Sequence, residues 1–259
     1  MVDPTNVLIT GCNRGIGQRL LAAILSRANH IVIAAVRDPR STASQALYDL
    51  PHGPGSKIIV LQIDSTSTTD AFAAVDTLKS KHQITRLDLV ITNAGISKYI
   101  GKADVTPAEE MLDHFKINSM APLLLFQATS APLSLSAKPK FVAMSSGAGS
   151  IGLMDKLPVP NTAYGSSKAA LNFIMRRIHF ENPHLIVFPV NPGWLRTELG
   201  NHAARSVGLS EAPVAIQDGV KGVLDVIDHA TREDTSGKFL SWDKDELVCR
   251  NSNDYMKIK

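Results

Sequence analysis

Short apolar runs alternate with segments of helical periodicity along most of the chain. The runs are short and continuous, which is typical of strands that are buried on both faces of a sheet. They lie at 7–10, 30–36, 57–63, 87–92, 139–144 and 185–190, with a last one near Phe239. Strands and helices that alternate in this way form parallel sheets with right-handed crossovers. The pattern therefore predicts an α/β fold, a Rossmann-type doubly wound parallel sheet of about seven strands with helices on both faces.

The size of the chain fits one α/β domain. At 259 residues, of which 44% are hydrophobic, the chain is long for one average domain and short for two. We expect a single domain over 1–259, in which the polar segment 194–213 forms a lid over a substrate site. The net charge of +3 is dispersed along the chain and forms no basic stripe for nucleic acid.

The remaining composition excludes several classes of protein. Cys12 and Cys249 form no disulfide framework, which favours a reducing compartment, and the eight scattered histidines predict no metal site. No apolar run approaches the ~18 residues that a membrane span requires. We expect a soluble cytoplasmic protein that binds a small molecule rather than a membrane.

A glycine-rich loop follows the first apolar run. Gly11, Gly15 and Gly17 have the spacing Gly-x-x-x-Gly-x-Gly, and a helical pattern begins directly after them. Glycines permit a tight turn and a close approach of the backbone, and the N-terminus of the next helix offers free N–H groups to phosphate. This context predicts a dinucleotide site, although a plain strand-to-helix turn would also use such glycines.

The end of the second apolar run indicates which dinucleotide is bound. A site for NAD usually has Asp or Glu there for the ribose hydroxyls, whereas this chain has Val36 followed by Arg37. Arg14 adds a second cation at the same end of the predicted sheet, and the carboxylate of Asp38 comes one position late. Guanidinium groups suit a 2′-phosphate, so the pattern favours NADP(H); the alternative is a surface cation at a strand end.

Tyr164 and Lys168 form a candidate acid/base pair. They are four residues apart in a segment of helical character, so their side chains lie on one face of the helix. A cation beside a phenol favours the phenolate and makes the tyrosine a usable acid/base near neutral pH. Ser145 and Ser146 follow the run 139–144, at the sheet edge where catalytic groups of open α/β sheets collect.

The helical segment around Asn118 contains a proline. Pro122 has no N–H, so the carbonyl of Asn118, four residues earlier, loses its helical partner and must bind another group, such as an ordered water. The simpler interpretation is a kinked packing helix.

Taken together, these motifs resemble the short-chain dehydrogenase/reductase family over 7–240, nearly the whole chain. The segment 10–17 is similar to its cofactor loop, 93–95 to its sheet-stabilising motif, and 191–193 with Thr197 to the segment that holds the nicotinamide. Four residues stand in family order as a catalytic tetrad: Asn118, Ser146, Tyr164 and Lys168. More loosely, 121–128, 141–151, 179–182 and 235–238 resemble the norsolorinic acid ketoreductase-like branch of fungal aromatic polyketide pathways.

The resemblance implies an NADPH-dependent reductase that transfers a hydride to the ketone of a mostly apolar, aromatic or polyketide-type substrate. Tyr164 would donate the proton, Ser146 would orient the carbonyl, and Lys168 would lower the pKa of Tyr164 and hold the nicotinamide ribose, linked through water to Asn118. Homodimers or homotetramers, formed by two long central helices, are also implied. The implied cofactor contacts are Gly11, Asn13, Arg14, Gly15, Ile16, Gly17, Arg37, Asp64, Asn93, Ala94, Gly95, Tyr164, Lys168, Pro192, Gly193 and Thr197.

Within that set the resemblance implies finer roles. Arg14 and Arg37 would take the 2′-phosphate, Asp64 the adenine edge and Thr197 the carboxamide. Candidates for an apolar pocket that accepts a ring, or else for core or lid packing, are Ile96, Tyr99, Met154, Leu157 and Trp194.

One departure from the family pattern leaves alternatives open. Ser146 precedes Tyr164 by eighteen residues, more than the family usually has, which predicts extra residues in 147–160 beside the substrate pocket. Ser145 therefore remains an alternative to Ser146. The same tetrad is also compatible with reduction of an enone or an iminium, and the fold with a non-catalytic NADP-sensing protein.

Overall fold

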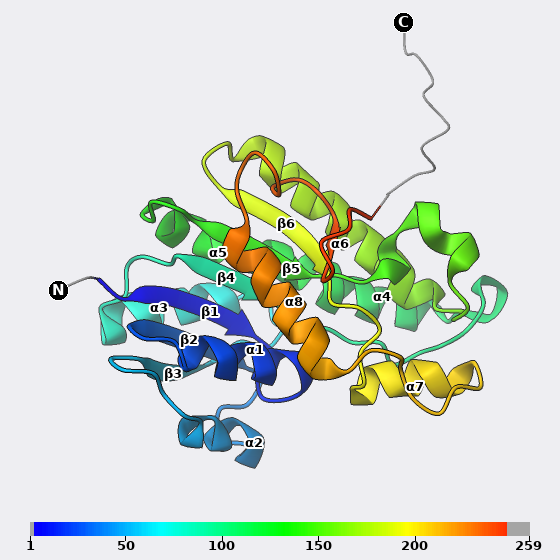
Figure 1. Cartoon of the computed structure of the whole chain (residues 1–259), viewed down its shortest axis with the longest axis horizontal. Coiled ribbons are helices and arrows are strands. Elements are labelled where there is room, and N and C mark those ends of the chain that lie inside the picture. The colour runs from blue at the N-terminus through cyan, green and yellow to red at the C-terminus, as the bar shows by residue number, and fades with distance from the viewer. Residues whose placement is uncertain (1–2, 248–259) are drawn as a thin grey trace, which may run out of the picture.

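The computed structural model describes residues 3–247 and has the predicted α/β architecture (Figure 1). Within these residues seven parallel strands form one sheet in the order β3-β2-β1-β4-β5-β6-β7. The chain runs outward from β1 through β2 to β3 and then crosses back to β4 on the other side of β1, and open α/β sheets bind ligands at such a reversal. The strands are β1 Thr5–Thr10, β2 His30–Val36, β3 Lys57–Gln62, β4 Leu89–Thr92, β5 Lys140–Met144, β6 Ile186–Asn191 and β7 Leu240–Ser241.

Helices cover both faces of this sheet (Figure 1). Helices α1 and α8 pack on one face, and α3, α5 and α6 pack on the other. The helices are α1 Gly15–Leu25, α2 Thr42–Gln45, α3 Asp70–His82, α4 Ala108–Phe115, α5 Ala121–Ser134, α6 Thr162–Glu181, α7 Glu198–Ser206 and α8 Ile216–His229. The short α2, with the helical turn Ala46–Asp49 after it, was not predicted from the sequence pattern.

The two layers explain why the strands read as continuous apolar runs. Along β1, Val7 and Ile9 belong to the core under α1 and α8, whereas Leu8 between them belongs to the core under α3, α5 and α6. Alternate side chains of a strand point to opposite faces, so a strand covered on both faces is apolar at every position. All three side chains are at most 1% exposed.

A π-helical turn, Lys116–Met120, separates α4 from α5. The N–H of Ala121 donates to the carbonyl of Lys116, five residues earlier, directly before Pro122. The disturbance that Pro122 predicts is thus a widened turn, a feature that is frequent at functional sites. Asn118 and Ser119 of this turn are fully buried, and both bind α6.

The segments expected beside a substrate pocket have defined structure. The segment 194–213 contains α7. Its two ends are joined by backbone bonds from Arg196 N to Val214 O (2.9 Å) and from Val214 N to Trp194 O (3.1 Å). The longer loop 147–160 contains two 3₁₀ turns, Gly147–Gly149 and Ile151–Lys156.

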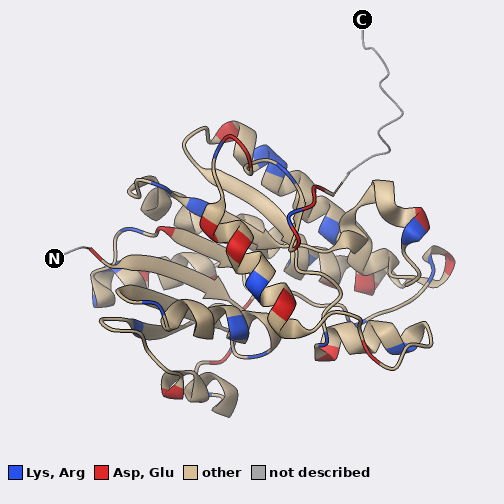
Figure 2. Ribbon diagram, in the orientation of Figure 1, with Lys and Arg blue, Asp and Glu red and all other residues tan. Residues whose placement is uncertain are grey.

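Charged groups are dispersed over the surface. Figure 2 shows both signs interspersed over the elements, with α8 carrying acidic and basic residues side by side. Across residues 3–247, no helix has both the length and the apolar character to cross a bilayer. The same residues contain no group of three or more His, Cys, Asp or Glu suited to a metal ion.

Candidate active site

Polar and glycine-rich segments meet where β1, β4, β5 and β6 end. Gly11 follows β1, Asn93 follows β4, Ser145 follows β5, and Asn191 closes β6. The strands are parallel, so their carboxyl ends lie at one edge of the sheet, and the start of α6 brings Tyr164 to that edge.

The glycine loop has the conformation that its spacing predicts. Gly11 and Gly15 have φ of +63° and +57°, a left-handed conformation that favours glycine. A Cβ on Gly11 would lie 2.8 Å from the Cα of Ala94, whereas one on Gly15 would meet no atom within 4 Å. The loop is therefore packed against the end of β4 on one side and open on the other.

Asn93 and Thr10 fasten this loop to the sheet. Asn93 Nδ2 donates to the carbonyls of Thr10 (3.0 Å) and Gly11 (2.9 Å). The hydroxyl of Thr10 accepts from the backbone N–H groups of Asn93 (3.0 Å) and Ala94 (3.1 Å). These four bonds fix the glycine loop to the end of β4. This is the sheet-stabilising role that the motif predicts.

The geometry of the loop fits a dinucleotide. Helix α1 begins at Gly15 with no side-chain cap and no acidic residue in its first turn, so its N-terminal N–H groups are available to a phosphate. A small hollow lies beside the ends of β1, β3 and β4, and Asp64 is in its wall. Its lining also includes Thr10, Ile63, Thr92, Ala94, Ile117 and Leu125.

The cations predicted for the 2′-phosphate lie at this end of the sheet. Arg37 is exposed directly after β2. Arg14 forms an exposed ion pair with Glu198 of α7 at 3.0 Å, which links the glycine loop to the 194–213 segment. Asn13 Nδ2 donates to Ser44 Oγ at 3.3 Å, and so joins the loop to α2, which follows Arg37.

Several other residues that were expected to contact the cofactor make contacts within their own segments. Asp64 Oδ1 accepts from the N–H and the hydroxyl of Thr66, both at 2.8 Å. Thr197 Oγ1 caps α7 by accepting from Gly200 N at 3.0 Å. Ile16 is half-buried against the α1 core, while Pro192 is buried next to Gly193, whose φ is +89°. These residues shape the loops, and the sequence could not distinguish that use from a direct contact.

Tyr164, Ser146 and Lys168 come together as predicted. The hydroxyls of Ser146 and Tyr164 are hydrogen-bonded, and Ser146 Oγ also accepts from Ala148 N at 3.2 Å. Lys168 is 5% exposed, its Nζ lies 5.8 Å from the centre of the Tyr164 ring, and it donates to the carbonyl of Met144 at 2.8 Å. A phenol, a hydroxyl and an ammonium therefore meet at the end of β5.

The expected lowering of the Tyr164 pKa by Lys168 is not what the structure gives. Burial raises the pKa of Tyr164 above its usual value, and the hydrogen bond with Ser146 only partly opposes this. Burial also lowers the pKa of Lys168 to about 8. Spacing in sequence brings the two groups together but contains no information on how deeply they are desolvated.

The two adjacent serines have different surroundings. Ser145 is buried, and its hydroxyl donates to Asn172 Oδ1 of α6 at 2.6 Å. Ser146 faces the phenol of Tyr164. The hydroxyl of Ser145 is thus engaged in the packing of β5 on α6, and Ser146 is the serine that adjoins Tyr164.

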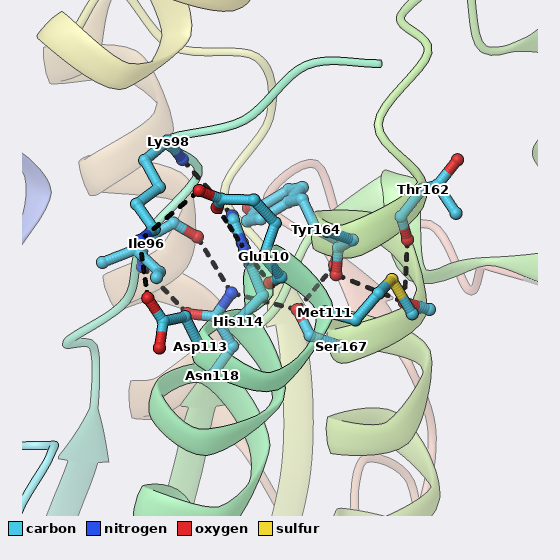
Figure 3. A network of polar contacts seen from close by, with 12 residues as sticks. Ile96, Lys98, Glu110, Met111, Asp113, His114, Asn118, Thr162, Tyr164 and Ser167 are labelled. Carbon is cyan, nitrogen blue, oxygen red and sulfur yellow. Dashed lines mark hydrogen bonds and ion pairs between the residues drawn. The ribbon is translucent and has the colours of Figure 1, made fainter. Parts of the chain in front are cut away.

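Asn118 is joined to Tyr164 through α6 (Figure 3). Its Nδ2 donates to the carbonyl of Ile96 (2.9 Å) and to Ser167 Oγ (3.0 Å), while its Oδ1 accepts from Ile96 N (2.8 Å). Ser167 Oγ in turn donates to the carbonyl of Tyr164 at 2.7 Å. The side chain of Asn118 therefore ties the segment after β4 to the turn of α6 that carries Tyr164.

The candidate pocket residues do not share one role. The ring of Tyr99 lies over Gly101, and its hydroxyl donates to the carbonyl of Val105 at 2.9 Å, so Tyr99 stabilises its own loop. Trp194 Nε1 donates to Gly200 O at 2.9 Å and packs the base of α7. Met154, in contrast, is 63% exposed in the loop 147–160, where Leu157 is half-buried.

Asn191 has a positioning role that sequence reasoning did not assign. Its Oδ1 accepts from Gly147 N (3.1 Å) and Gly193 N (3.3 Å), which joins the loop after β5 to the loop after β6. The signal was its place at the end of a predicted strand, next to Pro192. Ser119 and Ser167 were also missed, because a serine within a helical segment carries no specific signal.

Comparisons with known proteins agree with this geometry. Residues 5–207 match the model of the short chain dehydrogenase family. A norsolorinic acid ketoreductase of Aspergillus parasiticus is 42% identical over 240 residues, 92% of this chain and 88% of that protein. One of Dothistroma septosporum is 41% identical over 239 residues, 91% and 89% of the two chains.

A solved structure has the same fold. The NADPH-bound carbonyl reductase from chicken fatty liver superposes with a TM-score of 0.82 and 28% identity, covering 96% of this chain and 95% of that one. The family match extends over the glycine loop and the residues around Tyr164. The protein therefore belongs to the short-chain dehydrogenase/reductase family of oxidoreductases.

Proposed function

We propose that this protein is an NADPH-dependent ketoreductase in which Tyr164 donates the proton. The observation that carries the proposal is the contact between Tyr164 and Ser146, with Lys168 beside the same ring, at the sheet edge that also holds the glycine loop. The carbonyl reductase of similar fold is NADPH-bound, and the two relatives are named for a ketoreductase activity, which supports both parts of the proposal.

The residues available for NADP(H) surround the glycine loop. The open side of Gly15 and the first turn of α1 suit the pyrophosphate, and the exposed Arg37 suits the 2′-phosphate. The nicotinamide end would lie between Lys168 and the turn at Gly193. When bound there, NADPH supplies a hydride.

The side chains at the end of β5 then have distinct tasks. Burial keeps the Tyr164 phenol protonated at neutral pH, which a proton donor to a developing alkoxide requires. Ser146 donates a hydrogen bond to the same oxygen and thereby fixes the carbonyl beside the phenol. Lys168 holds the ribose and returns a proton towards Tyr164. Asn118 holds the segment at Ile96 in place against α6.

We propose an apolar aromatic or polyketide-type ketone as substrate. Ile151 and Met154, in the long loop after Ser146, are 65% and 63% exposed, and such apolar side chains suit the faces of a ring system. The relatives act, by their names, on norsolorinic acid. In this proposal the segment 194–213 is the lid of a single-domain enzyme, and the Arg14–Glu198 pair holds it near the cofactor loop.

The same reasoning extends to quaternary structure and location. Helices α4 and α6 pack together and expose Leu112, Phe115, Phe173 and Phe180, which are 50–69% exposed. A second copy of this chain is the occupant that we propose for this face, as a homodimer or homotetramer. Cys12 is a buried free thiol, which suits a reducing compartment such as the cytoplasm.

The test is a survey of substrates with the purified protein. NADPH absorbance is followed with a panel of aromatic ketones, quinones, enones and imines, and products are analysed after transfer of deuterium from labelled NADPH. We expect deuterium on a former carbonyl carbon. Deuterium on an alkene or imine carbon only, or tight NADPH binding without turnover of any compound, would contradict the ketoreductase assignment.

A further inference from the structure

A histidine that the proposed mechanism does not use is completely buried beside the site. His114, in the last turn of α4, has 0% of its surface exposed. Its imidazole lies between α4 and the segment 96–98, which follows Gly95 in the loop after β4 (Figure 3). An imidazole is costly to bury unless both ring nitrogens have partners, so its two contacts are informative.

The partners of His114 define its tautomer. Nε2 lies 3.3 Å from the backbone N of Lys98, and because a backbone N–H only donates, Nε2 must be the acceptor. Nδ1 lies 2.7 Å from the carbonyl of Glu110, and the Glu110 carboxylate is 3.6 Å away. Both of these groups are acceptors, so Nδ1 carries the proton.

A residue on the next helical turn also hydrogen-bonds the segment 96–98. Asn118 is four residues after His114, on the same side of the helix, and binds both the N–H and the carbonyl of Ile96. The two side chains together hold alternate residues of the segment 96–98. On the solvent side, Lys98 Nζ pairs with Asp113 at 2.6 Å and approaches Glu110 at 3.6 Å.

The segment held in this way adjoins the reacting groups. A Cβ on Gly95 would lie 3.1 Å from Asn118 Oδ1 and 3.6 Å from Lys168 Nζ. A displacement of 96–98 would therefore be transmitted to the side of Lys168 on which the nicotinamide ribose and the carbonyl substrate are expected. The hydrogen bonds of His114 go to this segment and to its own helix, to Lys98 N and the carbonyl of Glu110.

We propose that His114, as the Nδ1–H tautomer, is a positioning residue whose Nε2 holds the Lys98 N–H and fixes the segment 96–98 beside Lys168. The proposal rests on the proposed reductase function for its kinetic consequence only. The bond between His114 and Lys98 itself is open to measurement without any turnover.

Two substitutions separate hydrogen bonding from packing. His114→Leu fills the space but offers no acceptor, whereas His114→Gln keeps an acceptor oxygen on a side chain that reaches as far as Nε2. His229→Leu is the matched control, because His229 on α8 makes the same contact with the carbonyl four residues earlier (2.9 Å) and is exposed on its other side.

We expect His114→Leu to lower kcat/KM for the ketone roughly tenfold, the size expected when a buried N–H loses its acceptor. The Kd for NADPH should change by less than about threefold, because phosphate contacts at the α1 N-terminus dominate it. His114→Gln should recover most of kcat/KM, and His229→Leu should match the wild type. Amide hydrogen exchange at Lys98 should be slow in the wild type and in His114→Gln, and fast in His114→Leu.

Nitrogen-15 spectra of the histidine rings give a test on the unaltered protein, and they decide the matter if His114→Leu does not fold. A proton on Nδ1 of His114 supports the proposal, and a proton on Nε2 overturns it. Equal losses in the Leu and Gln variants, or unchanged exchange at Lys98 in His114→Leu, would reduce His114 to a packing residue. If the wild type reduces no ketone, the proposed function fails, while the tautomer and the exchange at Lys98 still decide the role of His114.

Discussion

Replacing Lys168 by methionine should make the protein more stable and less active. Burial lowers the pKa of Lys168 from 10.5 to about 8. At 1.36 kcal/mol per pKa unit, holding this ammonium in the folded state costs about 3 kcal/mol at neutral pH. The hydrogen bond to the Met144 carbonyl, at 2.8 Å, returns roughly 1.5 kcal/mol. Because methionine fills similar space without charge, Lys168→Met should raise the free energy of unfolding by about 1–2 kcal/mol at pH 7.

The change of the free energy of unfolding with pH has a defined sign. Between pH 8 and 10.5 the unfolded chain keeps the Lys168 proton while the folded chain has lost it, so the stability of the wild type rises with pH across this window. The advantage of Lys168→Met should therefore shrink from pH 7 to pH 10. Denaturant unfolding at both pH values measures it, with the exposed Lys79→Met as control.

Two results would refute this reasoning. Lys168→Met could be less stable than the wild type at pH 7, in which case the ammonium is well satisfied rather than desolvated. The difference could also be the same at pH 7 and pH 10, in which case Lys168 keeps its proton throughout. Ketone reduction should fall in the variant whichever stability is found, since the ribose loses its cation.

Three further predictions concern the cofactor and the proton. Gly11→Val should weaken NADPH binding at least about tenfold in calorimetry, because φ is +63° and a Cβ would lie 2.8 Å from Ala94; unaltered affinity would show that the loop can move. Arg37→Ala should raise KM for NADPH about tenfold and leave KM for NADH unchanged, and equal effects would remove the 2′-phosphate assignment. The kcat/KM for reduction should fall as pH rises above about 8, because Lys168 then loses the proton with which it holds the ribose and supplies Tyr164, whereas a rise would argue against a protonated Lys168 in the reaction.

The sheet was predictable because its inner strands are covered on both faces. Leu8 packs in one core and its neighbours Val7 and Ile9 pack in the other, so all three positions are apolar. That continuous apolar run is visible in the sequence. Pro122 likewise predicted a disturbed helix, because its missing N–H leaves a carbonyl of the preceding turn without a helical partner. The sequence did not specify that the disturbance is a π-turn. The short α2 carries no apolar period and escaped prediction.

The contents of the site were predictable, but not all of their environments. The spacing of Tyr164 and Lys168 on one helix sufficed to bring them together. The direction of the Tyr164 pKa depends on how deeply the ring is buried, a consequence of tertiary packing that the spacing cannot report. In the same way, the capping bond of Thr197 and the bridge that Asn191 makes between two loops arise from contacts with specific backbone groups.

The most direct test of the account is Tyr164→Phe, compared with the wild type in single-turnover ketone reduction with NADPH. The substitution removes only the phenol hydroxyl and its bond with Ser146, worth about 1 kcal/mol in stability, so the variant should fold and bind NADPH normally. Loss of the proton donor should lower the rate by roughly 10²–10⁴-fold. A rate within about threefold of the wild type, with NADPH bound equally well, would contradict Tyr164 as the proton donor.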